Sequence, residues 1–384
     1  QAAIRIRKMQ QGNYSLDLNR SALYFPTCKN FPYNTELEAT ITLVSTDGVS
    51  GSFIQPVVPS PEAITLRMHH SFVQLPDGNY TPRKFDPRSS FNNSSYYDYS
   101  SPVSTPIEKY VINRHRLIKK DPSAKISEPV KPIVYYLDNG TPEPIRTALL
   151  KGGNWWNQAF EAAGYKDAFV VKILPDTCDP MDIRYNMINW VHRSTRGWSY
   201  GASVVDPRTG EIIKGQVSLG SLRVRQDYMI AQGLLSPFGK KDMKDDPMLK
   251  MSLDRLEQLS AHEIGHTLGL MHNYAASTVD RSSVMDYPHP LIKLNKKGEF
   301  DFSDAYDLKI GDWDKVSIAW GYADLRNSKN EAEDLDKILT DAYAKGLKLK
   351  LSHTVFCLSS LYTCLFGGNA ISLSGNGEIP IFRG

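Results

Sequence analysis

Residues 261–273, with the sequence AHEIGHTLGLMHN, place histidines and a glutamate at spacings that suit metal chemistry. His262 and His266 are four residues apart, so on a helix their imidazoles project from one face, a single turn apart. Both ring nitrogens can then reach one ion at about 2.0–2.1 Å. Glu263 follows His262 directly and points beside that ion, where it can take a proton from a bound water. The pattern predicts a hydrolytic metal site.

A third imidazole can reach the same ion. Gly269 comes three residues after His266 and can adopt a positive φ at no steric cost, so a helix that ends there lets the chain bend back. His272 then supplies the third ligand. Three protein ligands with one open position are typical of a catalytic rather than a structural zinc, so we expect Zn²⁺ as the cofactor.

The element that positions this motif is a long helix, predicted from about residue 248. Five aliphatic side chains recur at helical spacing and are expected to form one broad apolar face. They are Leu249, Leu253, Leu256, Leu259 and Ile264.

The region before this helix is predicted to hold a sheet. A helix is expected over residues 144–164, with Pro144 at its start and Gly164 as its C-terminal stop. Strands are expected at residues 133–137, 168–174, 183–191, 199–205 and 212–219. Strand, helix, further strands and then a long helix is an α+β order.

Residues 1–125 are predicted to form a β-rich N-terminal domain. Its strands are expected near residues 15–25, 38–44, 63–73 and 107–117, with a long polar loop or connector over 82–106. Residues 126–325 then form the second domain, and residues 326–384 form a C-terminal helical segment with a tail.

Composition excludes several classes of protein. The 384 residues include 45 basic and 42 acidic side chains, and a net charge of +3 argues against a nucleic-acid-binding protein. The 41% hydrophobic and 23% charged residues are typical of a globular chain, and no run of 18 apolar residues could span a membrane. Four cysteines are too few for a disulfide scaffold. The substrate and the oligomeric state are left open.

The pattern His-Glu-x-x-His-x-x-Gly-x-x-His, followed by Met285 in SSVMDYP, resembles the metzincin clan of zinc endopeptidases. More narrowly, FDPR at residues 85–88, RHRL at 114–117 and IGDWDK at 310–315 are similar to segments of a bacterial family of large exported zinc-dependent metalloproteases. The resemblance implies a metzincin-like catalytic domain, a twisted mixed sheet with an active-site helix, preceded by the β-rich domain.

The same resemblance implies roles for further residues. Met285 belongs to a turn beneath the metal and supports it structurally, while Tyr287 is an additional displaceable ligand or an oxyanion-stabilising group. Gly201, Ala202 and Ser203 lie on the edge strand that binds an extended protein or peptide substrate. Residues 287–290 form one wall of the pocket beyond the cleaved bond. The expected location is extracellular, periplasmic or in the cell envelope.

Two alternatives remain open. In a gluzincin-type enzyme a downstream glutamate, such as Glu299, replaces His272 as the third ligand. Alternatively, the chain is a catalytically silent zinc-binding or scaffold protein that acts through its β-rich domain. His289 is expected to be a solvated turn residue.

The two ends of the sequence carry expectations of their own. Because it begins with Gln1 and has no leader, we interpret it as a mature or excised segment. The apolar tail over residues 348–384 departs from the resembling family, and we hypothesise a truncation or a reading-frame change.

Overall fold

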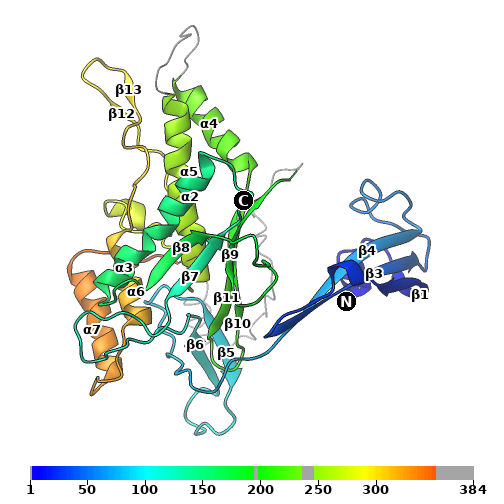
Figure 1. Ribbon diagram of the computed structural model, residues 1–384, viewed down its shortest axis with the longest axis horizontal. Coiled ribbons are helices and arrows are strands. Elements are labelled where there is room, and N and C mark those ends of the chain that lie inside the picture. The colour runs from blue at the N-terminus through cyan, green and yellow to red at the C-terminus, as the bar shows by residue number, and fades with distance from the viewer. Residues whose placement is uncertain (1, 194–197, 236–245, 352–384) are drawn as a thin grey trace, which may run out of the picture.

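The computed structural model describes residues 2–193, 198–235 and 246–351. A small β-rich region comes first, and a larger body of helices packed on a mixed sheet follows (Figure 1). The expected α+β class, with the β-rich part leading, is confirmed. From residue 352 onward the expected divergent tail lies outside the described residues.

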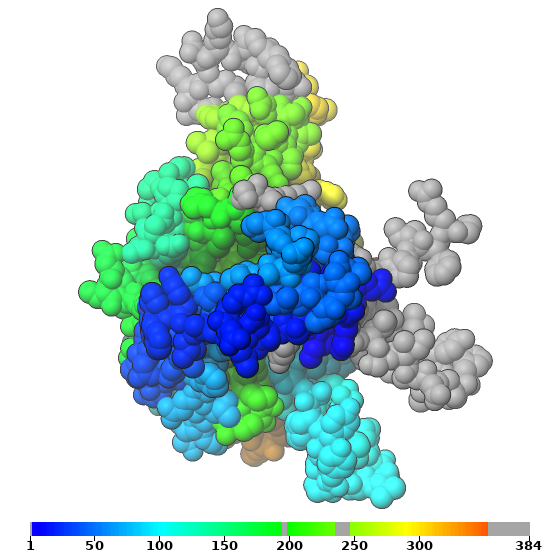
Figure 2. All heavy atoms as spheres, turned by 90° about the vertical axis from the view of Figure 1, so that its right-hand side faces the viewer, coloured from blue at the N-terminus to red at the C-terminus, as the bar shows by residue number. Residues whose placement is uncertain are grey.

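The N-terminal sheet is built around one long strand. β3 (Asn34–Ser45) pairs antiparallel with β1 (Tyr14–Leu23), β2 (Lys29–Asn30) and β4 (Ala63–Val73). The short helix α1 (Ala2–Lys8) and a small apolar core complete this region. In Figure 1 this sheet projects to the side of the larger body, and the view turned by 90° looks onto it, in blue, in front of that body (Figure 2). Asn34 links the two regions, because its side chain bonds the backbone of Met181 and Ile183.

The connector between these regions contains a hairpin that sequence reasoning placed in a loop. β5 (Asn93–Tyr97) pairs antiparallel with β6 (Glu108–Ile112), so the expected loop over 82–106 is partly wrong, as is the length of the strand expected over 107–117. The sequence of β5 is mostly polar and lacks the apolar alternation that predicts a strand. Its partner β6 comes only after the intervening turn residues. Phe91 and Ile112 are fully buried in the core of the larger region. The domain boundary near residue 125 stays a prediction.

The larger region is organised by a five-stranded sheet in the order β10-β11-β9-β7-β8. Four strands run parallel, and β10 pairs antiparallel with β11 at the edge of the sheet. The bounds are β7 (Ile133–Leu137), β8 (Phe169–Ile173), β9 (Asn186–Val191), β10 (Tyr200–Val205) and β11 (Ile212–Gly220). The sheet is therefore mixed, as expected, and among the described residues β10 pairs on one side only.

The single helix expected over 144–164 is two helices. α2 (Ile145–Asn154) and α3 (Trp156–Ala162) meet at Trp155, whose N–H bonds the carbonyl of Gly152 three residues back, which tightens the chain there. The break lets Trp156 bury its ring and donate to the Ala261 carbonyl of the next long helix at 2.8 Å. Gly164 ends the segment, as expected.

The long helix α5 (Pro247–Thr267) is buried on nearly every side, so the single apolar face expected for it is wrong. Its N-terminus is capped by Asp246, which accepts the N–H groups of Met248 and Leu249. Helices α2 and α4 (Leu222–Leu235) and the sheet pack around it. Polar residues are thereby enclosed as well, and they include Ser252, Asp254, Arg255, Glu257, Gln258 and Ser260.

The remaining elements are short or lie after α5 in the chain. They are β12 (Lys293–Leu294), β13 (Phe300–Asp301), α6 (Asp312–Tyr322), α7 (Glu331–Ala344) and the short turns η1 (Phe25–Thr27) and η2 (Ala276–Thr278). Within the three described ranges, no helix combines the length and the apolar character needed to cross a bilayer.

His115, which sequence reasoning treated as an ordinary histidine, is buried between the sheet and the end of α5. Its Nε2 lies 3.0 Å from the Tyr135 hydroxyl and 3.1 Å from the Thr267 carbonyl oxygen. Burial lowers the pKa of His115 to about 4. The folded protein therefore holds this ring neutral at pH values where the unfolded chain binds a proton.

This burial predicts a pH-dependent stability. Because the folded pKa lies below the unfolded value of about 6.5, the contribution is complete above pH 6.5 and is lost as the pH falls toward 4. The expected loss is about 3 kcal/mol, at about 1.4 kcal/mol per pKa unit. Urea unfolding at a series of pH values measures it, and His115→Gln should flatten the dependence. Equal pH slopes for the two proteins would contradict the assignment.

Candidate metal centre

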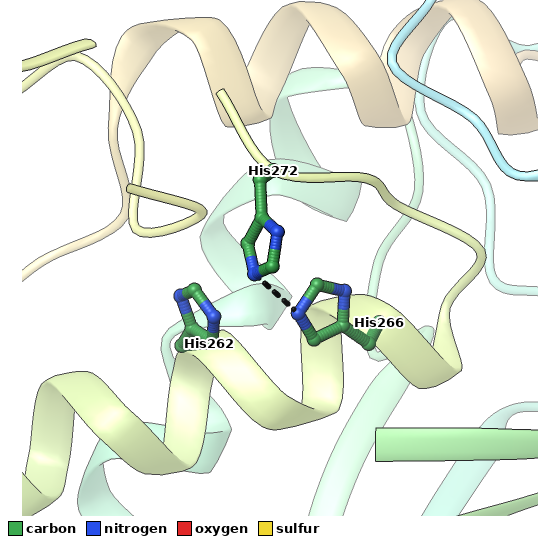
Figure 3. Close-up of side chains that lie close together, drawn as sticks. All are labelled: His262, His266 and His272. Carbon is green, nitrogen blue, oxygen red and sulfur yellow. Dashed lines mark hydrogen bonds between the residues drawn. The ribbon is translucent and has the colours of Figure 1, made fainter. Parts of the chain in front are cut away.

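Three histidines converge at the C-terminal end of α5 (Figure 3). His262 and His266 come from successive turns of the helix, and His272 descends from the loop that follows it. The bend between them occurs at Gly269, where φ is +100°. A Cβ there would collide with the Asn113 carbonyl, so both the conformation and the space require glycine.

The loop that carries His272 is braced by a segment from the N-terminal third of the chain. The Met271 N–H donates to the Ser90 carbonyl and the Asn92 N–H donates to the Gly269 carbonyl, each at 2.7 Å. The Asn273 N–H donates to the Met285 carbonyl at 3.0 Å. These bonds fix the backbone on both sides of His272.

The geometry of the three rings fits a metal ion. Their ligand atoms all lie within 4.8 Å of one another, and the Nε2 atoms of His266 and His272 are 3.1 Å apart. His262 is 1% exposed, and its buried Nε2 has no hydrogen-bond partner among the residues that the structure describes. Burial lowers the pKa of all three imidazoles, that of His272 to about 4, so the rings are neutral and carry free lone pairs. A shared cation explains the unpaired nitrogen.

The other nitrogen of each ring is already engaged. His262 Nδ1 lies 2.8 Å from the Val284 carbonyl oxygen, and His266 Nδ1 lies 2.8 Å from the Leu270 carbonyl oxygen. His272 Nδ1 lies 3.2 Å from the Tyr274 hydroxyl. Partners at Nδ1 orient each ring with Nε2 toward the centre, which is the usual arrangement around metal-ligating histidines.

Tyr274 was missed by sequence reasoning, because only the bent loop brings its hydroxyl back to His272. We expect Tyr274→Phe to weaken zinc binding by about 10-fold. This is the lower end of the range for losing a residue that hydrogen-bonds a metal ligand, because Tyr274 is exposed. Competition with a chelator measures the affinity, and the exposed Tyr99→Phe serves as the control. Unchanged affinity would show that the hydroxyl does not orient His272.

Met285 packs against the part of α5 that carries two of the histidines. It is buried, and its sulfur packs against Gly265, which sits on α5 between His262 and His266. The turn before it is clamped by the buried carboxylate of Asp314 on α6, which accepts the Ser283 hydroxyl and the N–H groups of Val284 and Gly311. The Val284 carbonyl oxygen contacts His262 Nδ1, so by holding Val284 in place Asp314 also helps to orient the His262 ring.

Comparison with known families gives two matches. Residues 244–350 match a family model described as Met-zincin, a range that contains the three histidines and the Met285 turn. This part of the chain is metzincin-like. Residues 2–120 match a model described as a domain of unknown function (DUF5117). Neither the curated proteins nor the solved structures yield a match.

In the metzincin-like site, Glu263 is enclosed beside the histidines. The residue is 5% exposed, and burial raises the pKa of its carboxyl group to about 7. The charge of Arg255 and the nearby Gly201 N–H favour the ionised carboxylate, and both partly oppose the effect of burial. A carboxyl group with a pKa near neutral can accept and release a proton under ordinary conditions.

The edge strand β10 runs against α5 through its small residues. Along it, Gly201 and Ser203 face the helix, where the Ser203 hydroxyl lies 3.4 Å from the Thr267 carbonyl oxygen, and Ala202 is exposed. A Cβ on Gly201 would collide with the Glu263 carbonyl and crowd His266 Cβ. The strand can therefore approach the metal centre only because residue 201 has no side chain.

Gly201→Ala is expected to push β10 away from α5. We expect a loss of about 1–3 kcal/mol in the free energy of unfolding, the usual range for overpacking a tight contact. Chemical unfolding measures the change, with Ala202→Ser as a control because that side chain points outward. A Gly201→Ala protein as stable as wild type would contradict this packing.

Tyr287 lies above the histidines, and its function stays a prediction. Its ring centre is 4.7 Å from that of His272 and 5.1 Å from that of His262, yet the residue is 53% exposed. His289 is exposed, as expected. Glu299 belongs to the β12–β13 hairpin, where it bonds Asn295, and Figure 1 places this hairpin beside the opposite end of α5. The gluzincin arrangement therefore gains no support.

Proposed function

We propose that this chain is a zinc-dependent endopeptidase. The observation that carries the proposal is the convergence of three neutral imidazoles, one with an unpaired buried nitrogen, beside a glutamate whose pKa is about 7. The match to the Met-zincin model supports the same reaction class. We expect the protein to act outside the cytoplasm, as the family resemblance implies.

His262, His266 and His272 would hold the zinc ion through their Nε2 atoms. Zinc, when bound, supplies Lewis-acid chemistry: it polarises a carbonyl and lowers the pKa of water toward 7. The neutral state of the three rings serves this binding, because a protonated imidazole has no lone pair to offer.

Glu263 performs the proton transfers. Its carboxylate takes a proton from the water whose oxygen attacks the scissile carbonyl carbon, and it delivers that proton to the amine nitrogen as the C–N bond breaks. The charge of Arg255 and the nearby Gly201 N–H favour the ionised form that accepts the first proton. We infer that the Tyr287 hydroxyl stabilises the developing oxyanion, because the tyrosine ring centre lies 4.7 Å from that of His272 and 5.1 Å from that of His262.

The outer side of β10 binds the substrate. An extended peptide can pair with the edge strand by backbone hydrogen bonds, which bind it largely independently of sequence. The inward glycine at position 201 brings that peptide close to Glu263. Residues 287–290, which follow the Met285 turn, form a wall on the other side.

Metal analysis combined with an unbiased peptide-cleavage profile tests the proposal. We expect one zinc ion per chain and hydrolysis of internal peptide bonds by the zinc-loaded protein. Zinc binding without cleavage of any peptide would favour the alternative, a zinc-binding or scaffold protein that acts through its N-terminal sheet. The N-terminal region exposes Leu18 and Phe72 on its sheet and Phe25 on the turn η1, which could contact a partner.

A further inference from the structure

A short segment after α7 lies against the loop that carries the third metal-binding histidine. At the end of α7, φ is +83° at Gly346, and the Leu347 N–H donates to the Ala342 carbonyl at 3.2 Å. A glycine with a positive φ just after a helix commonly turns the chain away from the helix axis. The turn leads residues 348–350 to Asn273, on the loop that follows α5.

Helix α7 gives this 348–350 segment a fixed starting point. Leu335 and Leu339 of α7 are buried in the main core, and the Tyr343 ring centre lies 5.7 Å from that of Trp313 on α6. Bonds between the 348–350 segment and the loop after α5 therefore connect that loop to an anchored part of the protein.

The side chain of Asn273 makes this connection. It is fully buried, its Nδ2 donates to the Lys348 carbonyl at 2.8 Å, and its Oδ1 accepts the Lys350 N–H at 3.0 Å. The backbone adds a third bond, from the Tyr274 N–H to the Lys350 carbonyl at 2.9 Å. The amide thus pairs with the segment through one donor and one acceptor, and only one orientation of the amide satisfies both.

These contacts assign Asn273 a role inside the protein rather than at the substrate. Its Oδ1 also accepts the Ala275 N–H at 3.2 Å, so both lone pairs of the oxygen are used. An enclosed amide of this kind acts through its neighbours in the chain. They are His272, which precedes it, and Tyr274, whose hydroxyl lies 3.2 Å from His272 Nδ1.

His272 is the metal ligand whose position depends most on this loop, because the other two histidines are part of α5. Before His272, the loop is held through Ser90 and Asn92. After it, the Asn273 N–H donates to the Met285 carbonyl, and the Asn273 side chain adds the connection to the segment after α7. A loop that moves freely holds the third imidazole in place for only part of the time, and the apparent metal affinity falls by that fraction.

We propose that Asn273 is a positioning residue, which joins the 348–350 segment to the active-site loop and thereby places His272 for the metal ion. The inference rests on the proposed function, because it takes the three histidines as zinc ligands. At Lys350 the contacts with the loop come from the backbone, and the side chain is exposed. The Lys350 N–H therefore matters to the metal centre, whereas the Lys350 ammonium group does not.

Asn273→Leu in the full chain tests the proposal, because leucine has nearly the same size and lacks hydrogen-bonding groups. Zinc affinity is measured by chelator competition with metal-free protein. The visible absorption of the Co²⁺-loaded protein reports the geometry of the ligands. We expect zinc binding to weaken by about 10-fold or more, the effect of losing a residue that supports a metal ligand. The Co²⁺ absorption should weaken as well, because water replaces the third imidazole for part of the time.

Asn154→Leu is the matched control. The Asn154 side chain also binds backbone groups of a distant segment, since its Oδ1 accepts the Val171 N–H at 2.9 Å and its Nδ2 donates to the Leu150 carbonyl at 2.8 Å. These contacts join α2 to β8, at the end of the sheet opposite β10. Both variants should lower the free energy of unfolding, but only Asn273→Leu should change zinc affinity and the Co²⁺ spectrum.

A second pair of variants changes only an exposed residue, so the fold should survive in both. Lys350→Pro removes the N–H that donates to Asn273, whereas Lys350→Ala keeps it. We expect the proline variant to lose zinc affinity in the same direction as Asn273→Leu, and the alanine variant to bind zinc as the wild type does.

Wild-type zinc affinity in Asn273→Leu overturns the proposal, and so do equal losses in Asn273→Leu and Asn154→Leu. If Asn273→Leu does not fold, equal affinities of the Lys350→Pro and Lys350→Ala proteins overturn it. The metal measurements do not depend on cleavage. Weakened metal binding in a protein whose wild type cleaves no peptide therefore supports the positioning role and removes the endopeptidase function, whereas cleavage with unchanged metal binding has the opposite meaning.

Discussion

Replacing Glu263 with glutamine is expected to lower peptide turnover by roughly 10²–10⁴-fold while zinc stays bound, the range that a positioned acid–base group contributes. Glutamine has the same shape as glutamate, so the enclosed position should tolerate it. It cannot take a proton from water. The expected signature is therefore a loss in kcat with unchanged metal content.

Glu257→Gln is the matched control for this experiment. Glu257 is buried on the same helix but pairs with Lys151 at 2.9 Å, away from the histidines. Its replacement should leave kcat within a few-fold of wild type. If the Glu263→Gln protein cleaved peptides at the wild-type rate, another group would have to move the proton.

Removing the third imidazole is expected to have the second large effect. His272→Ala should weaken zinc binding by more than about 100-fold, beyond what loss of an outer partner causes. His272 supplies one of three nitrogens that lie within 4.8 Å of one another. Without it, only the two histidines of α5 remain, and two ligands on one helix cannot enclose an ion. Chelator competition measures the affinity, and loss of zinc should abolish cleavage.

His289→Ala is the control, since this histidine is exposed on the segment after Met285. Full zinc affinity in His272→Ala would revive the gluzincin alternative. Glu299→Gln would then be the next variant to measure, because Glu299 is its candidate third ligand.

Local spacing was enough to predict the three histidines and the bend. Side chains four residues apart, such as those of His262 and His266, lie on one face of any helix. A glycine shortly after a helix, such as Gly269, commonly adopts a positive φ and lets the chain bend. The parallel strands were also visible, because β7 and β8 are short apolar runs. These signals need no knowledge of distant residues.

Contacts between residues far apart in the sequence could not be predicted, because they depend on which segments the fold brings together. The polar side chains of α5 looked solvent-facing in a one-dimensional pattern, yet α2 and α4 cover them. Asp314 clamps a turn 30 residues earlier in the chain, and nothing in its immediate sequence specifies that partner.

The brace at Ser90 and Asn92 has a consequence for how the protein can be cut into pieces. These residues belong to the part that matches the N-terminal family model, yet their backbone fixes the loop carrying His272. A fragment limited to residues 244–350 would also lack the strands on which α5 rests. The histidine motif therefore depends on segments outside the range of its own family match, and during synthesis His272 is made long after the scaffold that holds its loop.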